Sequence, residues 1–568
     1  MNGVEDLLAN ALEHHRAGRL AKAGELYGKI LRKHPRHAGA LYLTGLAKQA
    51  LGHPDRALQL YEKAAQADPA NPLYHHALGL ALGAAGRPRE AEAVFREALA
   101  AAPNEAGLWT ALGNLLKAER RFDEAVTAQT KALDLAPGEP EVMSNLGAAL
   151  GEAGRHDEAL ECFRAALARA PDHPELHFNL GNALLVTGRR GEAEEELRHA
   201  VRLAPDHARA WSSLGVSQRE QGKIDRAIAS LSEAIRLAPD YADAHFNLGL
   251  AMLTKGPSVA GWREYDWRRK IPGFAMRPVD RPRWDGTELD GGTLLVHAEQ
   301  GLGDTIQFVR YVREAVNSGG RVVVESPPPL VRLLAGADLG VEIVPCAAER
   351  PLCDVQIPLM SLPGLLDPEL KRAGALVPYL KADLELARHW RHKLGPRGAL
   401  KVGLCWQGNP SYRVDRDRSI PVDLLARLAT VRGVRLVSLQ KGQGREQLLG
   451  ARGVLPIEDL GDGFDRDGSG DGRGAFLDTA AVMACLDLVV TSDTAVAHLA
   501  GAMGVEVWML LCRAPDWRWG REGAASPWYP SMRIFRQDRA GDWESVIARA
   551  AGELARRLDS HAHAATGT

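Results

Sequence analysis

Small and apolar residues recur with a fixed period of 34 residues in the first half of the chain. Three residue types keep this step: proline from 35 to 239, glycine from 45 to 249, and alanine from 57 to 227. A single globular core needs no such register, whereas a stack of similar helix pairs does. In such a stack small residues let two helices cross closely, and a proline ends the second helix. The pattern predicts an α-solenoid over residues 1–256, with about seven and a half units.

One unit shows the complete pattern. Its characteristic residues are Leu78, Gly79, Gly86, Ala91, Phe95, Ala98, Leu99 and Pro103. Their order resembles the tetratricopeptide repeat (TPR), a helix–turn–helix unit of 34 residues. We therefore expect a TPR superhelix.

Three asparagines share one repeat position, two residues before the periodic glycine. They are Asn145, Asn179 and Asn247. We expect them to face the concave groove, where amide side chains would hydrogen-bond the backbone of an extended peptide. Asparagine is also a common filler at this repeat position, so a structural role is the alternative.

Beyond Pro257 the register ends and the hydrophobic pattern changes. Residues 257–290 hold an aromatic and basic segment, GWREYDWRRK, followed by a proline-rich stretch, which predict a closing helix and a linker. From residue 291, short apolar runs alternate with glycine loops and helical segments, as in parallel α/β sheets. We expect two Rossmann-like halves, 291–395 and 396–560, facing each other across a cleft, and a disordered tail over 561–568.

Charge and cysteine usage narrow the class of protein. Lys and Arg number 70 against 72 Asp and Glu, so no global basic field attracts nucleic acid or anionic lipid. The six cysteines form no CxxC pair and no metal-ligand spacing, which suits a reducing compartment. The first residues read as an amphipathic repeat rather than a signal peptide, and no run of about 18 uncharged apolar residues occurs. We expect a cytoplasmic protein with no membrane span and no bound metal.

The loop after the first apolar strand is one candidate site, because open α/β sheets bind ligands at strand ends and helix starts. Gln300 and Gly303 lie in this loop, where glycine lets the backbone approach a ligand. Asp304 begins the following helix and is either an N-cap or a general base for an acceptor hydroxyl. The loop also resembles the start of a dinucleotide fingerprint, with Glu325 ending the next strand. Ile306 stands where that fingerprint requires glycine or alanine, which argues against NAD.

A second candidate loop joins the strand LDLVV to the next helix. Its residues are Ser492, Asp493, Thr494 and Ala495. The polar residues can cap the helix, whose free N–H groups form a site for a diphosphate. Asp493 would repel a diphosphate, so capping, or holding a ribose hydroxyl or a metal, suits it better. His498, one turn later, is either structural or reaches a phosphate.

The third candidate follows the strand KVGLC. It consists of Trp406, Gln407 and Asn409, with a basic run at Arg413, Arg416 and Arg418 just beyond. This run is either a solvated charged loop or a cationic clamp for a departing diphosphate. Lys441, after the strand VRLVSLQ, would converge on the same edge.

Two further features have plainer interpretations. Residues 465–471 resemble the start of an EF-hand loop, but Phe476 stands where a bidentate glutamate is required, so we expect a flexible acidic loop. The second is an aromatic cluster that serves either packing or sugar stacking: Trp517, Trp519, Trp528 and Tyr529.

Taken together, these segments resemble bacterial TPR proteins with a C-terminal glycosyltransferase domain of the heptosyltransferase-like (family 9, GT-B) type. The matching segments are HAEQGLGDTIQFVRY, VGLCWQGNPSYRVDRDRSIPVDLL, SLQKG, SDTAVAHLAGAMG, and APDWRWG through SPWYP. The resemblance implies that Asp304 is catalytic, that Asp493, Thr494 and His498 hold the donor's diphosphate, and that Arg418 is the family's basic residue. Ala495 departs from the glycine of that family. The layout is also similar to TPR-containing O-GlcNAc transferases, which modify protein Ser and Thr.

The resulting expectation is a TPR solenoid followed by a GT-B domain, acting as a metal-independent, inverting glycosyltransferase. A nucleotide-diphosphate sugar is its co-substrate, no other cofactor is required, and the solenoid presents a protein or glycan acceptor. Asp304 is the expected base. The expected donor-binding set is Gln300, Gly303, Trp406, Gln407, Asn409, Arg418, Lys441, Ser492, Asp493, Thr494, Ala495 and His498. The alternative is a TPR adaptor whose GT-B domain has lost catalysis.

Overall fold

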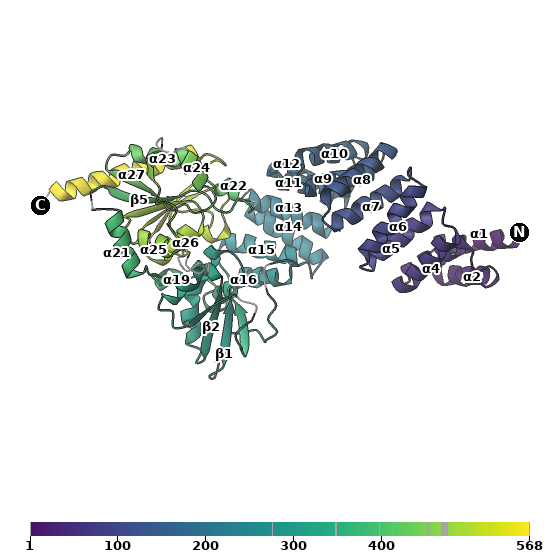
Figure 1. Ribbon diagram of the computed structural model, residues 1–568, viewed down its shortest axis with the longest axis horizontal. Coiled ribbons are helices and arrows are strands. Elements are labelled where there is room, and N and C mark those ends of the chain that lie inside the picture. Colours follow the sequence, from purple (N-terminus) through teal and green to yellow (C-terminus); the bar gives the residue numbers. More distant parts are fainter. Residues whose placement is uncertain are drawn as a thin grey trace. The chain divides into compact units, whose positions relative to one another are not determined.

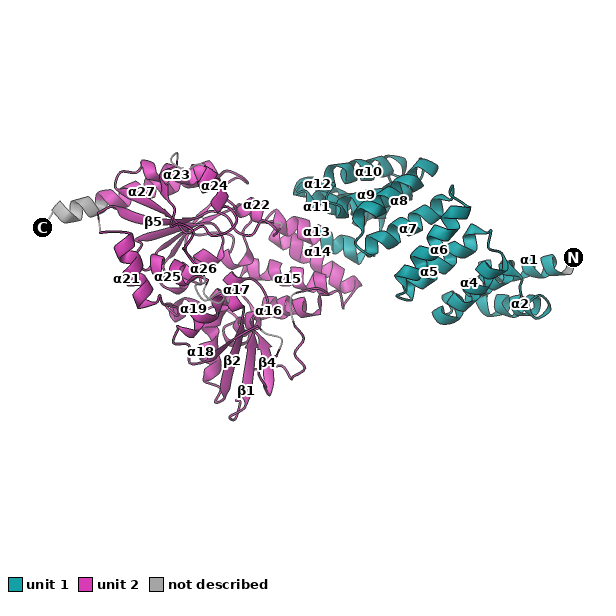
Figure 2. Ribbon diagram, in the orientation of Figure 1, with its two compact units in different colours: residues 1–213 teal, residues 214–568 magenta. Residues whose placement is uncertain are grey.

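The computed structural model describes residues 2–274, 277–346, 349–396, 398–412, 414–450, 455–466 and 475–566. The chain divides into two compact units, residues 1–213 and 214–568, and the division falls inside one helix (Figure 2). The sequence predicts a solenoid that ends at residue 256. The second unit instead contains the last solenoid helices together with the α/β part.

The first unit is a series of antiparallel helix pairs (Figure 1). Its helices are α1 (Asn2–Arg16), α2 (Leu20–Lys33), α3 (Ala38–Ala50), α4 (Pro54–Ala67), α5 (Pro72–Ala84), α6 (Pro88–Ala101), α7 (Ala106–Ala118), α8 (Phe122–Leu135), α9 (Pro140–Glu152), α10 (His156–Arg169), α11 (Pro174–Val186), α12 (Arg190–Leu203) and the start of α13 (Ala208–Glu220). The expected TPR-like solenoid is confirmed.

The periodic glycines sit where the two helices of a pair cross. A Cβ added at Gly79 in α5 would lie 2.3 Å from Cε1 of Phe95 in α6. A Cβ at Gly181 in α11 would lie 2.7 Å from Cγ of Leu197 in α12. Real Cβ atoms do not approach other atoms so closely. Glycine therefore recurs at these positions because the two helices of each pair pack too closely for a larger residue.

The periodic prolines have a second role that the sequence did not suggest. In two repeats a tryptophan lies six residues after the proline, and its indole N–H donates a hydrogen bond to the carbonyl oxygen of that proline. The distances are 2.9 Å from Trp109 Nε1 to Pro103 O and 3.0 Å from Trp211 Nε1 to Pro205 O. In other repeats a histidine takes this place, as in the 2.8 Å contact between His177 Nε2 and the carbonyl of Pro171. These bonds satisfy a carbonyl at the end of one helix pair and tie it to the next helix.

The second unit begins with helices that continue the solenoid. They are the rest of α13, α14 (Ile224–Leu237), α15 (Ala242–Lys255), α16 (Val259–Tyr265) and the 3₁₀ helix η1 (Asp266–Lys270). A Cβ at Gly249 in α15 would lie 2.3 Å from the backbone nitrogen of Tyr265, so α16 packs on α15 as the second helix of a pair. The crossing register therefore extends to Tyr265, beyond the position where the alanine and proline periods stop.

A four-stranded parallel sheet follows, in the order β3-β2-β1-β4 (Figure 1). Its strands are β1 (Thr293–His297), β2 (Arg321–Ser326), β3 (Glu342–Pro345) and β4 (Val355–Pro358). Its helices are α17 (Leu302–Phe308), η2 (Val309–Tyr311), α18 (Val312–Val316), η3 (Pro328–Leu330), α19 (Val331–Ala335), η4 (Leu359–Ser361), α20 (Leu362–Leu366) and η5 (Ala373–Leu376). The chain reverses its strand order between β1 and β4, which is where open α/β sheets bind ligands.

The second sheet is also parallel, with six strands in the order β10-β9-β8-β5-β6-β7. Its strands are β5 (Leu400–Cys405), β6 (Val434–Ser438), β7 (Ile457–Glu458), β8 (Leu488–Thr491), β9 (Val507–Leu511) and β10 (Met532–Arg536). Its helices are α21 (Leu384–Lys393), α22 (Asp415–Arg418), α23 (Val422–Ala426), η6 (Arg427–Thr430), α24 (Arg445–Gly450), α25 (Leu477–Met483), α26 (Ala495–Ala502), η7 (Trp517–Trp519) and α27 (Trp543–Thr566). Helix α27 runs into 561–566, where the sequence predicts a disordered tail.

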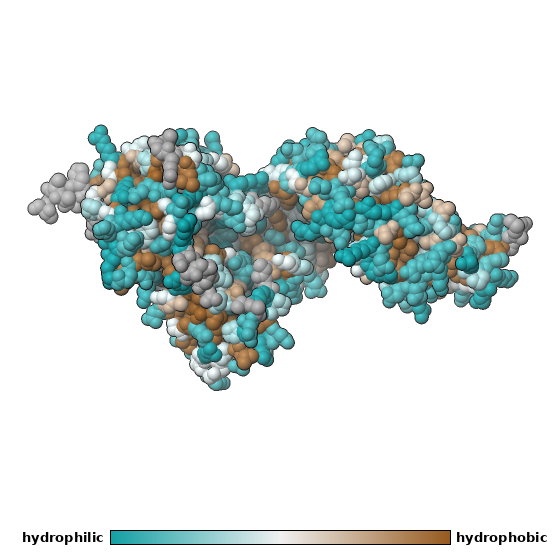
Figure 3. All heavy atoms as spheres, viewed as in Figure 1, coloured by the Kyte–Doolittle hydropathy of each residue, from teal (hydrophilic) through white to brown (hydrophobic). Residues whose placement is uncertain are grey.

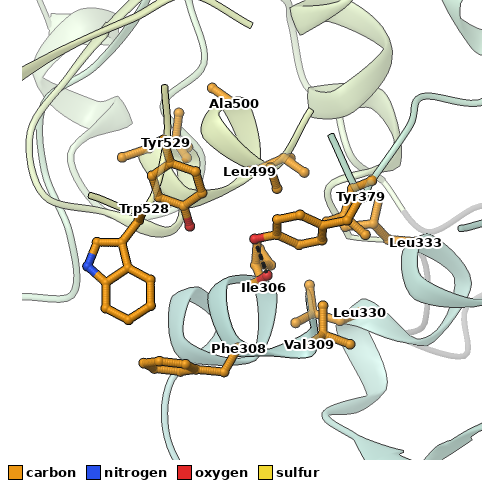
Figure 4. Packing of buried hydrophobic residues seen from close by; sticks show 14 of the residues in the cluster. Ile306, Phe308, Val309, Leu330, Leu333, Tyr379, Leu499, Ala500, Trp528 and Tyr529 are labelled. Carbon is orange, nitrogen blue, oxygen red and sulfur yellow. Dashed lines mark hydrogen bonds between the residues drawn. The ribbon is translucent and has the colours of Figure 1, made fainter. Parts of the chain in front are cut away.

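One hydrophobic core joins the two sheets and the last solenoid helices. It includes Leu253 of α15 and Trp262 of α16 as well as residues around both sheets. Figure 4 shows part of it, where Phe308 of α17 lies near Trp528. Their ring centroids are 5.6 Å apart in an edge-to-face arrangement. This shared core places the loops of the two sheets in fixed relation to each other.

The face of the molecule seen in Figure 3 is largely polar. Hydrophilic residues dominate the face of each unit in Figure 3, and apolar residues lie between them in small groups. Within the described ranges, no helix has both the length and the apolar character needed to cross a bilayer.

Candidate functional site

Asp304 lies in the first turn of α17, just after β1. Its carboxylate accepts the backbone N–H of Gly301 at 3.0 Å, so it closes the turn from the third helical position instead of serving as the N-cap. The other carboxylate oxygen accepts a hydrogen bond of 2.5 Å from Nη2 of Arg518. Burial raises the pKa of Asp304 above its ordinary value, and Arg518 opposes that rise.

Arg518 is a central residue that the sequence analysis did not single out. It lies in η7, after β9, and its side chain is only 8% exposed. Besides Asp304, its guanidinium donates to Asp516 at 2.8 Å and to the side-chain oxygen of Gln307 at 2.7 Å. Arg518 therefore links the loop after β9 to the first turn and the body of α17. The sequence feature that could have pointed to Arg518 is its position as a single cation between Trp517 and Trp519.

The loop after β8 brings Asp493 to the same place. Burial and the nearby carboxylate of Asp516 raise the pKa of Asp493 to about 6, while Arg418 and Arg518 oppose the rise. Asp493 in turn favours the charged form of Arg418. We call Asp304, Arg418, Asp493, Asp516 and Arg518 the site cluster. Its members follow the carboxyl ends of β1, β5, β8 and β9, and so come from both sheets.

The start of α26 has no side-chain cap among the described residues. Thr494 is its N-cap and Ala495 its first residue, and within the described part of the chain the Thr494 side chain makes no capping bond. The Thr494 hydroxyl lies 3.2 Å from that of Thr491. The buried hydroxyl oxygen of Ser492 has no hydrogen-bond partner among the described residues. Backbone N–H groups in a first turn with no side-chain cap favour an anion.

The contacts of His498 favour the structural one of its two alternatives, and phosphate binding stays untested. Its Nδ1 lies 3.0 Å from the Tyr529 hydroxyl, and its ring stacks on that of Trp519 with 5.3 Å between centroids. Burial and nearby arginines hold the pKa of His498 well below its usual value, so it is neutral. A Cβ at Gly303 would lie 3.0 Å from Cδ2 of this ring. Gly303 thus lets α17 approach α26, which brings the first and second candidate loops together.

The third loop contributes Arg418 to the site cluster. Arg418 Nε donates to Asp415 at 2.8 Å, and a Cβ at Gly408 would lie 2.4 Å from Arg418 Nη2. Of the other basic residues predicted for this edge, Arg416 is exposed beside Asp417, and Arg413 lies outside the described residues. The ammonium group of Lys441 donates a hydrogen bond to the carbonyl oxygen of Phe464.

The remaining residues of the expected donor set lie in or beside these loops, and their role in binding a donor stays untested. Trp406 is fully buried, and Gln407 accepts a hydrogen bond of 2.6 Å from Gln447. Asn409 is exposed and accepts the Ser411 N–H at 3.0 Å, which stabilises a turn. Gln300 is half-buried before α17.

The repeat asparagines are half-buried, and two of them have local hydrogen-bond partners. Asn179 donates to the Ser144 hydroxyl at 3.2 Å, and Asn247 donates to the carbonyl of Asp243 at 2.8 Å. Asn145 and Asn179 belong to the first unit and Asn247 to the second. These bonds favour the structural alternative for Asn179 and Asn247, and the peptide-binding prediction stays untested.

The aromatic cluster is part of the core. Its four members are at most 5% exposed: Trp517, Trp519, Trp528 and Tyr529. Packing is therefore their role, as one of the two alternatives held. Most of the EF-hand-like segment, residues 467–471, lies outside the described residues. In the ranges that the structure describes, no group of three or more His, Cys, Asp and Glu side chains could hold a metal ion.

Comparisons with known proteins support the repeat assignment. Residues 3–209 match the family model of the cilia and flagella-associated protein 70 C-terminal domain, and residues 217–256 match the TPR repeat model. A stretch of 331 residues is 28% identical to protein FlbA of Caulobacter vibrioides (strain ATCC 19089 / CIP 103742 / CB 15), and it covers 53% of each protein. The chain thus spans about half the length of this curated relative.

Solved structures of TPR proteins are also similar. The TPR protein from Parabacteroides merdae ATCC 43184 is 17% identical, with 44% of this chain and 100% of that chain covered and a TM-score of 0.39. A thermophilic TPR protein from Thermus thermophilus is 25% identical, with 32% and 99% covered and a TM-score of 0.29. The Cut9 and Hcn1 complex of the APC/C is 21% identical, with 48% and 55% covered and a TM-score of 0.38. All three TM-scores are below 0.5, so these similarities carry no further argument.

Proposed function

We propose that this chain is a glycosyltransferase that moves a sugar from a nucleotide-diphosphate donor to a hydroxyl of an acceptor. The observation that carries the proposal is the site cluster. Acidic and basic side chains from four strand ends of two parallel sheets meet there, at the edge where α/β proteins bind ligands. The GT-B resemblance of these same loops agrees with that chemistry.

In the proposed reaction Asp304 accepts the proton of the acceptor hydroxyl. The hydroxyl oxygen forms a bond to the anomeric carbon while the bond between that carbon and the diphosphate oxygen breaks. The electron pair of the broken bond leaves with the nucleoside diphosphate. Burial, which raises the pKa of Asp304, suits it to this role because a base works best when its pKa is near the working pH. A single displacement of this kind inverts the anomeric centre.

Arg418, Arg518 and the start of α26 would stabilise the departing diphosphate. The two guanidiniums supply positive charge, and the first-turn N–H groups of α26 supply donors. Arg518 holds Asp304 in the present arrangement, so the proposal requires Arg518 to share its donors with the incoming diphosphate. The unpartnered hydroxyl of Ser492 lies next to this helix start and offers one more donor.

The solenoid would bind the acceptor, as the repeats of a TPR scaffold bind protein. The layout similar to TPR-containing O-GlcNAc transferases favours a protein acceptor, and a glycan precursor is the alternative. If the α/β part has lost catalysis, the chain is instead an adaptor.

A thermal-shift panel with UDP, GDP, ADP, CMP, NAD and the matching nucleotide sugars tests the proposal. A ligand that binds only the folded state stabilises it by about 2.7 kcal/mol at a hundredfold excess over its Kd. We expect one nucleoside diphosphate to raise the Tm, and Arg418→Gln to remove most of that shift. A shift with NAD alone contradicts the proposal, and no shift in folded protein favours the adaptor.

A further inference from the structure

A large basic cavity lies apart from the site cluster, where the closing segment of the solenoid meets the four-stranded sheet. Its volume is about 920 Å³, which falls within the range of cavities that bind small molecules. It is lined by α16 and η1, by the stretch 277–285, and by the end of β4 with residues of η4 and α20. None of the site-cluster residues lines it.

The position of the cavity in the sheet is that of a ligand site. His297, the last residue of β1, and Pro358, the last residue of β4, both line it. The strand order reverses between these two strands, and open parallel sheets bind ligands at such reversals. His297 is buried, and its Nε2 lies 2.9 Å from the side-chain oxygen of Gln356. Burial lowers the pKa of His297, so its imidazole is a neutral hydrogen-bonding group in the wall.

The lining has more cationic than anionic side chains, although Arg277 pairs with Glu325 at 3.0 Å. Five cationic side chains line the cavity: Arg263, Arg269, Lys270, Arg277 and Arg283. The carboxylates in the lining are Asp266 and Asp285, and both already have partners. Asp266 accepts hydrogen bonds from Arg268 at 2.7 Å and from Ser361 at 2.7 Å, and it also pairs with Arg283. Asp285 accepts the Thr287 hydroxyl at 2.7 Å.

Three of the cations have no direct ion-pair partner among the described residues. Within the described ranges, no carboxylate lies within ion-pairing distance of Arg263, Arg269 or Lys270. Lys270 places its ammonium 3.5 Å from the centroid of the Trp267 ring. Partial burial and then the neighbouring charge of Arg283 lower the pKa of Arg269, while Asp266 opposes this, so a further anion would favour its charged form.

A buried hydrogen-bond network lies behind these cations. Arg268 and Glu299 are fully buried and joined by hydrogen bonds of 2.7 and 3.0 Å, and Glu299 also accepts the backbone N–H of Met360 at 3.1 Å. This network ties η1 to both β1 and η4. A preformed wall lowers the cost of ordering the cations around a ligand.

We propose that this cavity binds a small anionic ligand, a phosphate- or carboxylate-bearing molecule of about the size of a sugar phosphate. The cations of α16 and η1 bind its charged group, and the neutral pair of His297 and Gln356 meets its uncharged part. The site is independent of the proposed sugar transfer, because its lining shares no residue with the site cluster. It gives the closing segment of the solenoid a binding role.

Calorimetric titration of the full chain tests this site. The probes are inorganic pyrophosphate, glucose 6-phosphate, glucuronate and uncharged glucose. We expect at least one anionic probe to bind and glucose not to bind. Tighter binding of glucose 6-phosphate than of glucuronate would indicate phosphate recognition. The reverse order would indicate carboxylate recognition. Failure of all three anions at millimolar concentration overturns the proposal.

Variants of the chain show whether a bound anion lies in the cavity or at the proposed donor site. Arg263→Gln with Arg269→Gln removes two exposed cations of the lining, and we expect it to weaken the anion at least tenfold. Arg332→Gln with Arg432→Gln is the matched control, because these arginines are also exposed but do not line the cavity. Arg418→Gln changes the proposed donor site. If Arg418→Gln abolishes anion binding and the lining variant does not, the anion sits at the donor site and the present proposal is wrong.

Discussion

Arg518 and Asp304 form an ion pair of 2.5 Å between the loop after β9 and the first turn of α17. The pair connects the two parallel sheets, because α17 follows β1 of one sheet and Arg518 follows β9 of the other. It also holds the proposed base beside the proposed diphosphate site. One contact is therefore relevant both to stability and to the proposed activity.

Replacing Asp304 by Asn tests its role as a base. The amide keeps the shape of the side chain but cannot accept the proton, so turnover should fall by about 10²–10⁴-fold. Arg518 keeps Asp516 as a partner, so nucleotide binding should survive. Transfer from the donor found in the thermal-shift panel is the activity readout, and the ligand-induced Tm shift is the binding readout. Asp423→Asn, at an exposed carboxylate of α23, is the control. Full turnover in the Asp304 variant would exclude it as the base.

Truncating Arg518 should destabilise the second unit. Alanine leaves Asp304 and Asp516 without their cation, and breaking a buried ion pair costs on the order of 3–5 kcal/mol. Lysine keeps the charge but not the forked geometry, so its cost should be smaller. Urea unfolding followed by tryptophan fluorescence measures both. Arg521→Ala, at an exposed arginine of the same loop, should have little effect. Equal stability of the Arg518 and Arg521 variants would show that the ion pair contributes little.

The sequence predicted the loops of the site better than the contacts between them. Asp304, Arg418 and Asp493 were expected from loops that follow strands, because strand ends of a parallel sheet meet at one edge. Arg518 was missed because its partner Asp304 lies 214 residues away, and no local pattern predicts such a pair. Periodicity predicted the solenoid because every helix pair packs through the same small residues at the same positions.

The end of the solenoid could not be predicted from the same periodicity. In the last pair the contact of Gly249 with Tyr265 and that of His245 with Glu264 repeat contacts of earlier pairs, but the alanine and proline of the repeat are absent there. Tyr265 stands 34 residues after Leu231, which packs against Gly215 in the preceding pair. The basic cavity was missed for another reason. Its cations all lie between residues 263 and 283, which read as a closing helix and a linker, whereas the rest of its wall comes from the distant ends of β1 and β4.

The raised pKa of Asp493 predicts a pH-dependent contribution to stability. A carboxyl whose folded-state pKa lies near 6 holds its proton in the folded state while the unfolded chain, with a pKa near 4, has lost it. Between these values the folded state binds more protons, so this contribution to stability falls as pH rises from about 4 to about 6.

Comparison with Asp493→Asn isolates this effect, because other carboxyls titrate in the same range. We expect the stability of the wild type relative to the variant to fall from pH 4 to pH 6 and then to stay level. Urea unfolding at half-unit pH steps measures the difference. A difference that is flat over this range, or that rises with pH, contradicts the raised pKa of Asp493.

The periodic glycines allow a matched test of helix crossing in the solenoid. Gly79→Ala places a Cβ 2.3 Å from Phe95 Cε1, so the crossing of α5 and α6 must open, at a cost of about 1–3 kcal/mol. Gly107 lies in α7, and a Cβ there meets no atom within 4 Å. Gly107→Ala should therefore stabilise the helix by about 0.5–1 kcal/mol, because alanine loses less backbone entropy than glycine.

Thermal unfolding followed by far-UV circular dichroism should show opposite shifts in Tm for these two variants. Neither change alters charge or adds more than a methyl group, so only the space around the new Cβ differs. If both variants raise the Tm, the glycine at the crossing is dispensable and the helices can separate at little cost. If Gly79→Ala alone lowers it, the 34-residue glycine period is a packing requirement of each helix pair.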